Sequence, residues 1–187
     1  MPTDYGSISR MFKQNTDFSV FTGHGLRNEF MIAAIHGGSI QLHTSDMAKT
    51  IAGQKHGVYL FEGHTQNASQ SLYMRSDLFD EPQFSAMANQ YNRIVAIHGL
   101  AAARGDAVLV GGLDHELAHK ILDDLNHEKI AARPYTKPVV AVSRDNVCNR
   151  GILGKGVQLE IPKAMRMIEA LRADICQIID NSLPLSP

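Results

Sequence analysis

The sequence predicts a single α/β domain built on an open, twisted, parallel or mixed β-sheet that is flanked by helices. Three observations favour this class. Short, wholly apolar runs at 30–35 and 94–97 lead into a His-Gly pair, which is typical of strands buried on both faces of a sheet. Amphipathic helical patterns fit between several such runs. A chain of 187 residues without a linker or a low-complexity tract is long enough for one domain with a sizeable core.

The strands are predicted from apolar or alternating segments bounded by turn-forming residues. Residues 1–17 are polar and unpatterned, so we expect an irregular lead-in to a domain that spans 1–187. Strand-like segments follow at 18–22, 30–36, 57–62, 71–75, 93–98, 106–111, 138–143 and 156–161.

Capping residues locate four helices between or after these strands. Thr44 or Ser45 can cap the first, which runs to about residue 53, and Asp80 with Pro82 two residues later begins the second. Asp114 caps the third, and the fourth opens at residue 162. An apolar stripe at three- and four-residue spacing marks this last helix: Ala164, Ile168, Leu171, Ile175 and Ile178.

Composition excludes several classes of function. The net charge of −1 gives no basic excess for nucleic acid, and no apolar span is long enough for a membrane. Cys148 and Cys176 form neither a CxxC pair nor a disulfide framework. With no signal-like apolar segment at the N-terminus, we expect a cytoplasmic protein, monomeric and without nucleic-acid or membrane partners.

The tetrapeptide Ala-Ile-His-Gly occurs twice, at 34–37 and 96–99, each time closing an apolar run. A lone histidine at a strand end is more often a hydrogen-bonded rim residue than a ligand. The same context on two strands of one sheet favours instead the convergence of His36 and His98 at one edge, where open α/β sheets place their sites. Because imidazole is the commonest metal-binding side chain, we predict a Zn²⁺ site with ring nitrogens about 3–3.5 Å apart.

A catalytic zinc site needs a third protein ligand and an open position. The chain after His36 offers Gln41, His43 and Asp46. Gln41 is a weak ligand, and His43 or Asp46 could substitute for it. Asp46 also fits the first turn of the predicted helix, where acidic residues are favoured by the helix dipole.

Two further residues are candidates for catalysis. Glu160 lies in an apolar strand, where a carboxylate is costly unless it faces a polar cleft or a cation; it is either a general base or a strand residue on a solvated face. Arg150, in a glycine-bounded loop, could hold a substrate carboxylate or a developing oxyanion, or be an ordinary surface arginine.

Taken together, the ordered motifs resemble the poly-γ-glutamate hydrolase family of phages and bacteria. The matching stretches run in family order at 35–38, 79–82, 97–99, 110–114, 148–151 and 156–160. This resemblance implies a carboxypeptidase-like open α/β sheet and a zinc-dependent amidase that cleaves the γ-linked glutamate polymer of certain bacterial capsules. By motif, His36 and His98 match the zinc histidines and Glu160 the catalytic glutamate. Gln41 stands where the family has its glutamate ligand.

The sequence and the resemblance together predict a zinc-dependent hydrolase acting on an acidic γ-glutamyl polymer. Zinc is held by His36 and His98 with Gln41 or His43, while Glu160 takes the proton of the attacking water. A phage-encoded enzyme of this kind would reach its substrate on host lysis. The alternatives are a weakened or inactive binding protein on the same fold, and an amidase for another, small acylamino-acid substrate.

Overall fold

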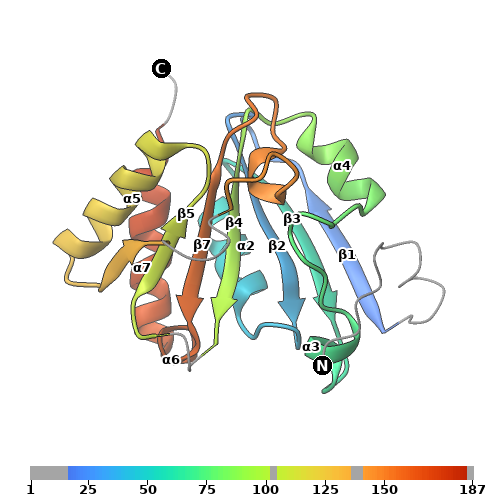
Figure 1. The fold of residues 1–187 in the computed structure, drawn as a ribbon, viewed down its shortest axis with the longest axis horizontal. Coiled ribbons are helices and arrows are strands. Elements are labelled where there is room, and N and C mark those ends of the chain that lie inside the picture. Colours follow the sequence, from blue (N-terminus) through green and yellow to red (C-terminus); the bar gives the residue numbers. More distant parts are fainter. Residues whose placement is uncertain (1–16, 102–104, 136–140, 185–187) are drawn as a thin grey trace.

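The computed structural model describes residues 17–101, 105–135 and 141–184. These residues form one seven-stranded mixed sheet with helices on both faces (Figure 1). The strands are β1 (Phe18–Gly23), β2 (Phe30–Gly38), β3 (Gly57–Gly63), β4 (Arg93–Leu100), β5 (Val108–Gly111), β6 (Ala132–Pro134) and β7 (Val157–Pro162). The predicted open mixed α/β sheet is confirmed.

The strand order is β1-β3-β2-β4-β7-β5-β6. Strands β3, β2, β4 and β7 pair in parallel, while β1 runs antiparallel to β3 and β5 antiparallel to β7. The chain leaves β2 for β3 on one side and then returns to β4 on the other side. The carboxyl ends of β2 and β4 therefore flank a topological switch point, where open α/β sheets bind their ligands.

Two apolar clusters cover the two faces of the sheet. One packs β2, β4 and β7 against α2 (Thr44–Ala52), α5 (His115–His127) and α7 (Glu169–Ser182). The other packs the opposite face against α3 (Ala68–Ser71), α4 (Pro82–Ala88) and the 3₁₀ turn η2 (Val147–Asn149). Because both faces are covered, residues 30–35 of β2 and 94–97 of β4 are wholly apolar up to the histidines that follow them, as predicted. Cys148 and Cys176 are buried free thiols.

The structure corrects three strand predictions. The predicted strand at 71–75 is absent: Ser71 ends the short helix α3, and residues 72–75 have no regular secondary structure. Of the predicted strand at 138–143, residues 138–140 lie outside the described residues, and 141–143 are not a strand. Strand β6 was missed because its three residues are too short and too polar to show a pattern. The expected lead-in at 1–17 lies outside the described residues except for its last residue.

The helix starts were predicted closely, with shifts of one residue. Asp114 caps α5 as expected, its carboxylate accepting from the Leu117 amide at 3.4 Å. Glu81 rather than Asp80 caps α4 and accepts from the Phe84 amide at 2.7 Å. The N-cap of α2 is His43, in the left-handed region at φ 68°, rather than Thr44 or Ser45.

The predicted last helix is two helices. Pro162 ends β7, α6 (Lys163–Met167) follows, and the extended backbone of Ile168 separates it from α7. Ile168 is consequently 55% exposed, although the predicted stripe made it a core residue. Among the described residues no helix is both long enough and apolar enough to cross a membrane.

Candidate metal centre

The two repeated histidines converge at the switch point. His36 in β2 and His98 in β4 place their Nδ1 atoms 3.1 Å apart, and both side chains are buried. The predicted spacing is therefore confirmed. Two imidazole nitrogens at this separation can share one ion of zinc, which binds histidine nitrogen at about 2.1 Å.

A β-bulge brings His36 to the same face of the sheet as His98. Ala33 and Ile35 pack in the same apolar cluster as Ala96, so strict alternation would turn His36 away from His98. The pairing of β2 with β3 shifts register between residues 34 and 37, which redirects the His36 side chain. Bulges of this kind commonly re-aim a side chain beside a functional site.

The hydrogen bonds of His36 define its tautomer. Its Nε2 lies 2.6 Å from the Met74 carbonyl, which can only accept, so Nε2 carries the proton and Nδ1 presents a lone pair toward His98. Burial lowers the pKa of His36 to about 4, although the Met74 bond opposes this shift. Burial, and then the neighbouring His36, also lower the pKa of His98. Both rings are therefore neutral at pH 7, the form that binds metal.

The segment after α3 encloses the histidine pair. Tyr73 stacks on the His36 ring with centroids 4.4 Å apart, Met74 accepts from that ring, and the Ser76 hydroxyl lies 3.5 Å from Nε2 of His98. Orienting groups of this kind fix ligand geometry around a metal. Sequence reasoning missed them, because the alternation around Tyr73 and Met74 was interpreted as a strand.

Gln41 is held beside the pair by the backbone of Gly99. Its Oε1 accepts from the Gly99 amide at 2.8 Å, and its Nε2 donates to the Gly99 carbonyl at 3.2 Å. The turn that carries it is closed by the Gln41 amide, which donates to the His36 carbonyl at 2.9 Å. Burial outweighs the effect of Gln41, which by itself would raise the pKa of the His36 ring. The predicted ligand position is thus next to the histidines but occupied by an amide.

His43 and Asp46 lie away from the pair. His43 caps α2 and its Nδ1 lies 2.9 Å from Oδ2 of Asp46, one helical turn later, on an exposed surface. Neither residue is among those lining the cavity at His98. The hypothesis that either replaces Gln41 as a ligand finds no support in this placement. Within the described residues, no three His, Cys, Asp or Glu side chains form a group that could hold a metal ion.

Glu160 faces the same cavity as His98. The two residues are register partners on β4 and β7, so their side chains project from the same face of the sheet. The Gln158 amide donates to Oε1 of Glu160 at 2.9 Å, and Asn146 in turn donates to Gln158 at 3.0 Å. This chain of amides orients the carboxylate. The predicted cleft-facing role of Glu160 therefore agrees with its position.

Arg150 is engaged elsewhere. Its guanidinium donates to the Phe79 carbonyl and, at 2.8 Å, to the Ser85 hydroxyl, and lies 5.0 Å from the centroid of the Phe84 ring. It is not among the described residues that line the cavity at His98. Arg150 thus secures the start of α4, and the structure does not bring it together with His36, His98 and Glu160. A different arginine, the buried Arg166, is close enough to feel the charge of Glu160.

The open side of the site is a cavity of about 430 Å³. The residues that line it include Gln41, His98 and Glu160 together with Tyr73, Arg75 and Tyr135. A smaller hollow of about 340 Å³ adjoins it across Gln41 and Gly99 and contains Lys163. Polar groups converge on neutral ligating nitrogens in a space large enough for a peptide-like chain.

An open α/β sheet with facing neutral histidines and an oriented carboxylate at its switch point defines the class of protein: an α/β fold with a candidate metal centre at the carboxyl ends of its central strands. The particular family follows from comparison. The model of the poly-γ-glutamate hydrolase family matches residues 3–178, so this chain belongs to that family.

Known relatives agree with this assignment. The UPF0714 protein YndL of Bacillus subtilis (strain 168) is 28% identical over 167 residues, covering 88% of this chain and 60% of YndL. The SPβ prophage-derived protein YoqZ of the same strain is 32% identical over 138 residues, covering 73% of this chain and 50% of YoqZ. This chain therefore spans about half to three-fifths of the length of these two relatives.

Solved structures share the whole fold. A bacteriophage poly-γ-glutamate hydrolase superposes with a TM-score of 0.90 at 27% identity, covering 96% of each chain. A zinc-free form of YndL gives a TM-score of 0.88 at 24% identity, covering 96% of this chain and 97% of that one. The second likeness concerns the fold alone.

Proposed function

We propose that this chain hydrolyses γ-glutamyl amide bonds, with poly-γ-glutamate as substrate, and uses a zinc ion held at His36 and His98. The observation that carries the proposal is the facing pair of neutral imidazoles, 3.1 Å apart and buried at the switch point of the sheet. The family supports the choice of the polymer. The zinc-free description of a structural neighbour supports the choice of the metal.

The donor set fits zinc, with one weak member. His36 and His98 supply two nitrogen ligands, and Oε1 of Gln41 is the nearest candidate for a third. An amide oxygen donates less charge than a carboxylate, so we expect weaker zinc binding than at a site with two histidines and one glutamate. When bound, zinc supplies Lewis acidity that polarises the scissile carbonyl and makes water more acidic.

Glu160 performs the proton transfers in this proposal. The Gln158 bond to Oε1 holds the carboxylate in one orientation beside His98. Glu160 takes a proton from the attacking water and delivers it to the nitrogen of the leaving amine. The positive charge of Arg166 nearby favours the ionised carboxylate that the first transfer needs.

Gln41 also favours a second candidate function, that of a binding protein with a weakened metal site. Both the oxygen and the nitrogen of its amide already bond the Gly99 backbone, so only the second lone pair of Oε1 is left for a metal ion. Such a protein would hold the γ-glutamyl chain in the same cavity without cleaving it.

One pair of variants tests the proposal. Glu160→Gln keeps the side-chain shape and should retain zinc and stability, while hydrolysis of poly-γ-glutamate falls by at least about a hundredfold. Glu128→Gln, an exposed change at the end of α5, is the matched control and should be fully active. Zinc content is measured by atomic absorption and chain length by size-exclusion chromatography.

Two results would overturn the catalytic proposal. Full activity of the zinc-loaded Glu160→Gln protein would remove Glu160 from the reaction. A zinc-loaded wild-type protein that binds labelled polymer without shortening it would establish the binding function instead.

A further inference from the structure

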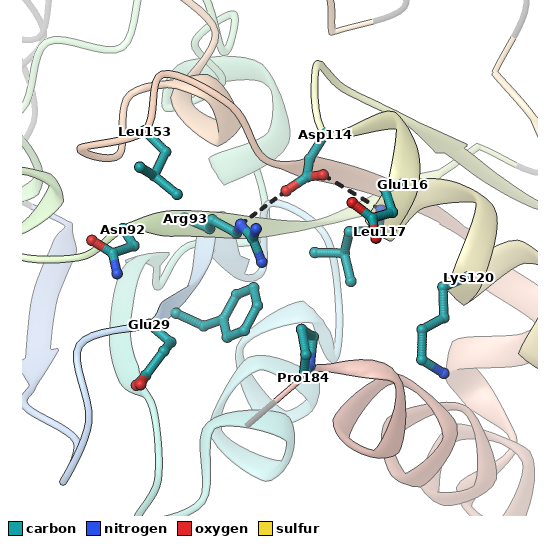
Figure 2. A pocket seen from close by; sticks show the side chains of 10 residues that line it. Glu29, Asn92, Arg93, Asp114, Glu116, Leu117, Lys120, Leu153 and Pro184 are labelled. Carbon is teal, nitrogen blue, oxygen red and sulfur yellow. Dashed lines mark hydrogen bonds and ion pairs between the residues drawn. The ribbon is translucent and has the colours of Figure 1, made fainter. Parts of the chain in front are cut away.

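A second cavity, of about 470 Å³, lies at the amino ends of β2 and β4, which are the ends opposite to the histidine pair. Figure 2 shows the residues that line it. It is lined by the residues that precede β2 and β4 and by the first turns of α5, and it shares no lining residue with the cavity at His98. The length of β4, eight residues, separates the two. Its position at the amino ends of the central strands makes it independent of the proposed active site.

Arg93 is the central cation of this cavity. Its Nε lies 3.1 Å from Oδ2 of the buried Asp114, and its guanidinium carbon lies 5.7 Å from the centroid of the Phe30 ring. Asp114 is also 3.3 Å from the Lys155 ammonium, so two cations share one carboxylate. Asp114 Oδ2 and Arg93 Nε are buried without a hydrogen bond of good geometry among the described residues. Because Asp114 faces Nε of Arg93, the terminal guanidinium nitrogens are the donors left for a further acceptor.

Acidic side chains stand on either side of Arg93. Glu29 comes from the chain just before β2, and its buried Oε2 has no hydrogen-bond partner in the described part of the chain. Glu116 projects from α5 on the other side, near Asp114 (Figure 2). A simple anion attracted to Arg93 would be repelled by these two carboxylates, and a simple cation would be repelled by Arg93. The charge pattern matches a ligand that carries both signs.

We propose that this cavity binds an α-amino acid as its zwitterion. The ligand carboxylate pairs with the free edge of the Arg93 guanidinium, which suits bidentate recognition. The ligand ammonium pairs with Glu29, whose Oε2 has no hydrogen-bond partner among the described residues. Phe30, Leu117 and Pro184 supply an apolar floor for the ligand's carbon chain.

The choice of glutamate as the amino acid rests on the proposed function. In a γ-linked polymer the residue at the amino end keeps both its α-ammonium and its α-carboxylate, exactly as free glutamate does. Two sources therefore present the same chemistry: free glutamate and the amino end of a γ-glutamyl chain. Lys120, on α5, also lines the cavity, and its ammonium pairs with Asp124 at 2.7 Å.

Calorimetric titration of the zinc-free protein tests the site, because metal-dependent binding at the histidine pair is then removed. L-glutamate should bind with a dissociation constant on the order of 1 mM, typical of a ligand of about ten heavy atoms. N-acetylglutamate, which lacks the ammonium, should bind at least about tenfold more weakly. If γ-glutamylglutamate binds as tightly as glutamate, the amino end of the chain is a natural occupant; weaker binding assigns the site to the free amino acid.

Two variants locate the binding. Arg93→Lys keeps a cation beside Asp114 and should therefore keep the fold, but a lysine cannot donate two parallel hydrogen bonds to the ligand carboxylate. Glu29→Gln removes the negative charge that pairs with the ligand ammonium. Each should weaken glutamate binding at least about tenfold, while Glu128→Gln should leave it unchanged.

The proposal is overturned if N-acetylglutamate binds as well as glutamate, if both variants bind like the wild type, or if no saturation is seen at about 20 mM ligand. Equal binding of alanine and glutamate would keep the amino-acid site and reject only its glutamyl identity. Polymer hydrolysis is measured separately, so loss of the proposed catalytic function leaves these results interpretable.

Discussion

Replacing Gln41 by glutamate should destabilise the zinc-free protein and strengthen zinc binding. In the structure Nε2 of Gln41 donates to the Gly99 carbonyl at 3.2 Å, while Oε1 accepts from the Gly99 amide. A carboxylate can keep the second bond but cannot make the first, and it places a negative oxygen against a carbonyl oxygen. Loss of such a bond with an unsatisfied group left behind costs about 1–3 kcal/mol.

The loss of stability and the gain in zinc affinity can each be measured. For a chain of this length, each kcal/mol changes the melting temperature by about 2–4 °C, so a cost of about 1–3 kcal/mol should make zinc-free Gln41→Glu melt roughly 2–12 °C below the wild type. Substitution of residues that merely contact the metal ligands alters metal affinity about 10–100-fold. A carboxylate at the ligand position itself should therefore tighten zinc binding by at least roughly tenfold. Differential scanning calorimetry and competition with a zinc chelator give the two values.

Two controls separate this reasoning from a general effect of charge. Gln90→Glu removes a comparable amide donor, 3.1 Å from the Ala86 carbonyl, on an exposed helix end, and should change neither value. Gln41→Ala should destabilise the protein without increasing its affinity for zinc. If zinc-free Gln41→Glu is as stable as the wild type, or binds zinc no more tightly, the assignment of residue 41 to the metal site is refuted.

Two further predictions concern residues outside the metal site. Arg150→Gln removes the hydrogen bonds to the Phe79 carbonyl and the Ser85 hydroxyl, so it should lower the free energy of unfolding, measured in urea, by about 1–3 kcal/mol. If the zinc affinity and the kcat of this variant are unchanged, Arg150 has no role in catalysis. Burial lowers the pKa of His56 below its ordinary value of 6.5, although Asp180 opposes this, so the folded protein keeps this ring neutral and loses stability as the pH falls below 6.5. In His56→Gln this loss of stability between pH 7 and pH 5 should be smaller, and an identical loss would contradict the assignment.

The sheet and the meeting of the histidines could be predicted because both depend on local patterns. Apolar runs ending in glycine identified β2 and β4, and the repeated tetrapeptide placed His36 and His98 at equivalent strand ends. The bulge that turns His36 toward its partner left no such pattern, because it arises from the pairing of β2 with β3. Convergence was therefore predicted correctly, whereas its structural cause was not.

Residues that act through distant contacts escaped prediction. Met74 fixes the His36 tautomer through its carbonyl, a group that every residue possesses, so no side-chain signal marks it. Arg150 lies in a loop that resembles an active-site loop, yet its partners Phe79 and Ser85 are 71 and 65 residues away in sequence. His56 is 2% exposed and lies edge-on to the ring of Phe30, a residue that is distant in sequence.

The two copies of the tetrapeptide contribute through different atoms. Gly37 lets α2 approach β2, since a Cβ there would meet Ser45 and Glu62. Gly99 lets the Arg166 guanidinium approach, and it also offers its amide and its carbonyl to one side chain, that of Gln41. A donor and an acceptor side by side are complementary to an amide and only half complementary to a carboxylate. The same peptide group that stabilises Gln41 in the zinc-free protein therefore opposes a glutamate there, unless a metal ion is present to hold its charge.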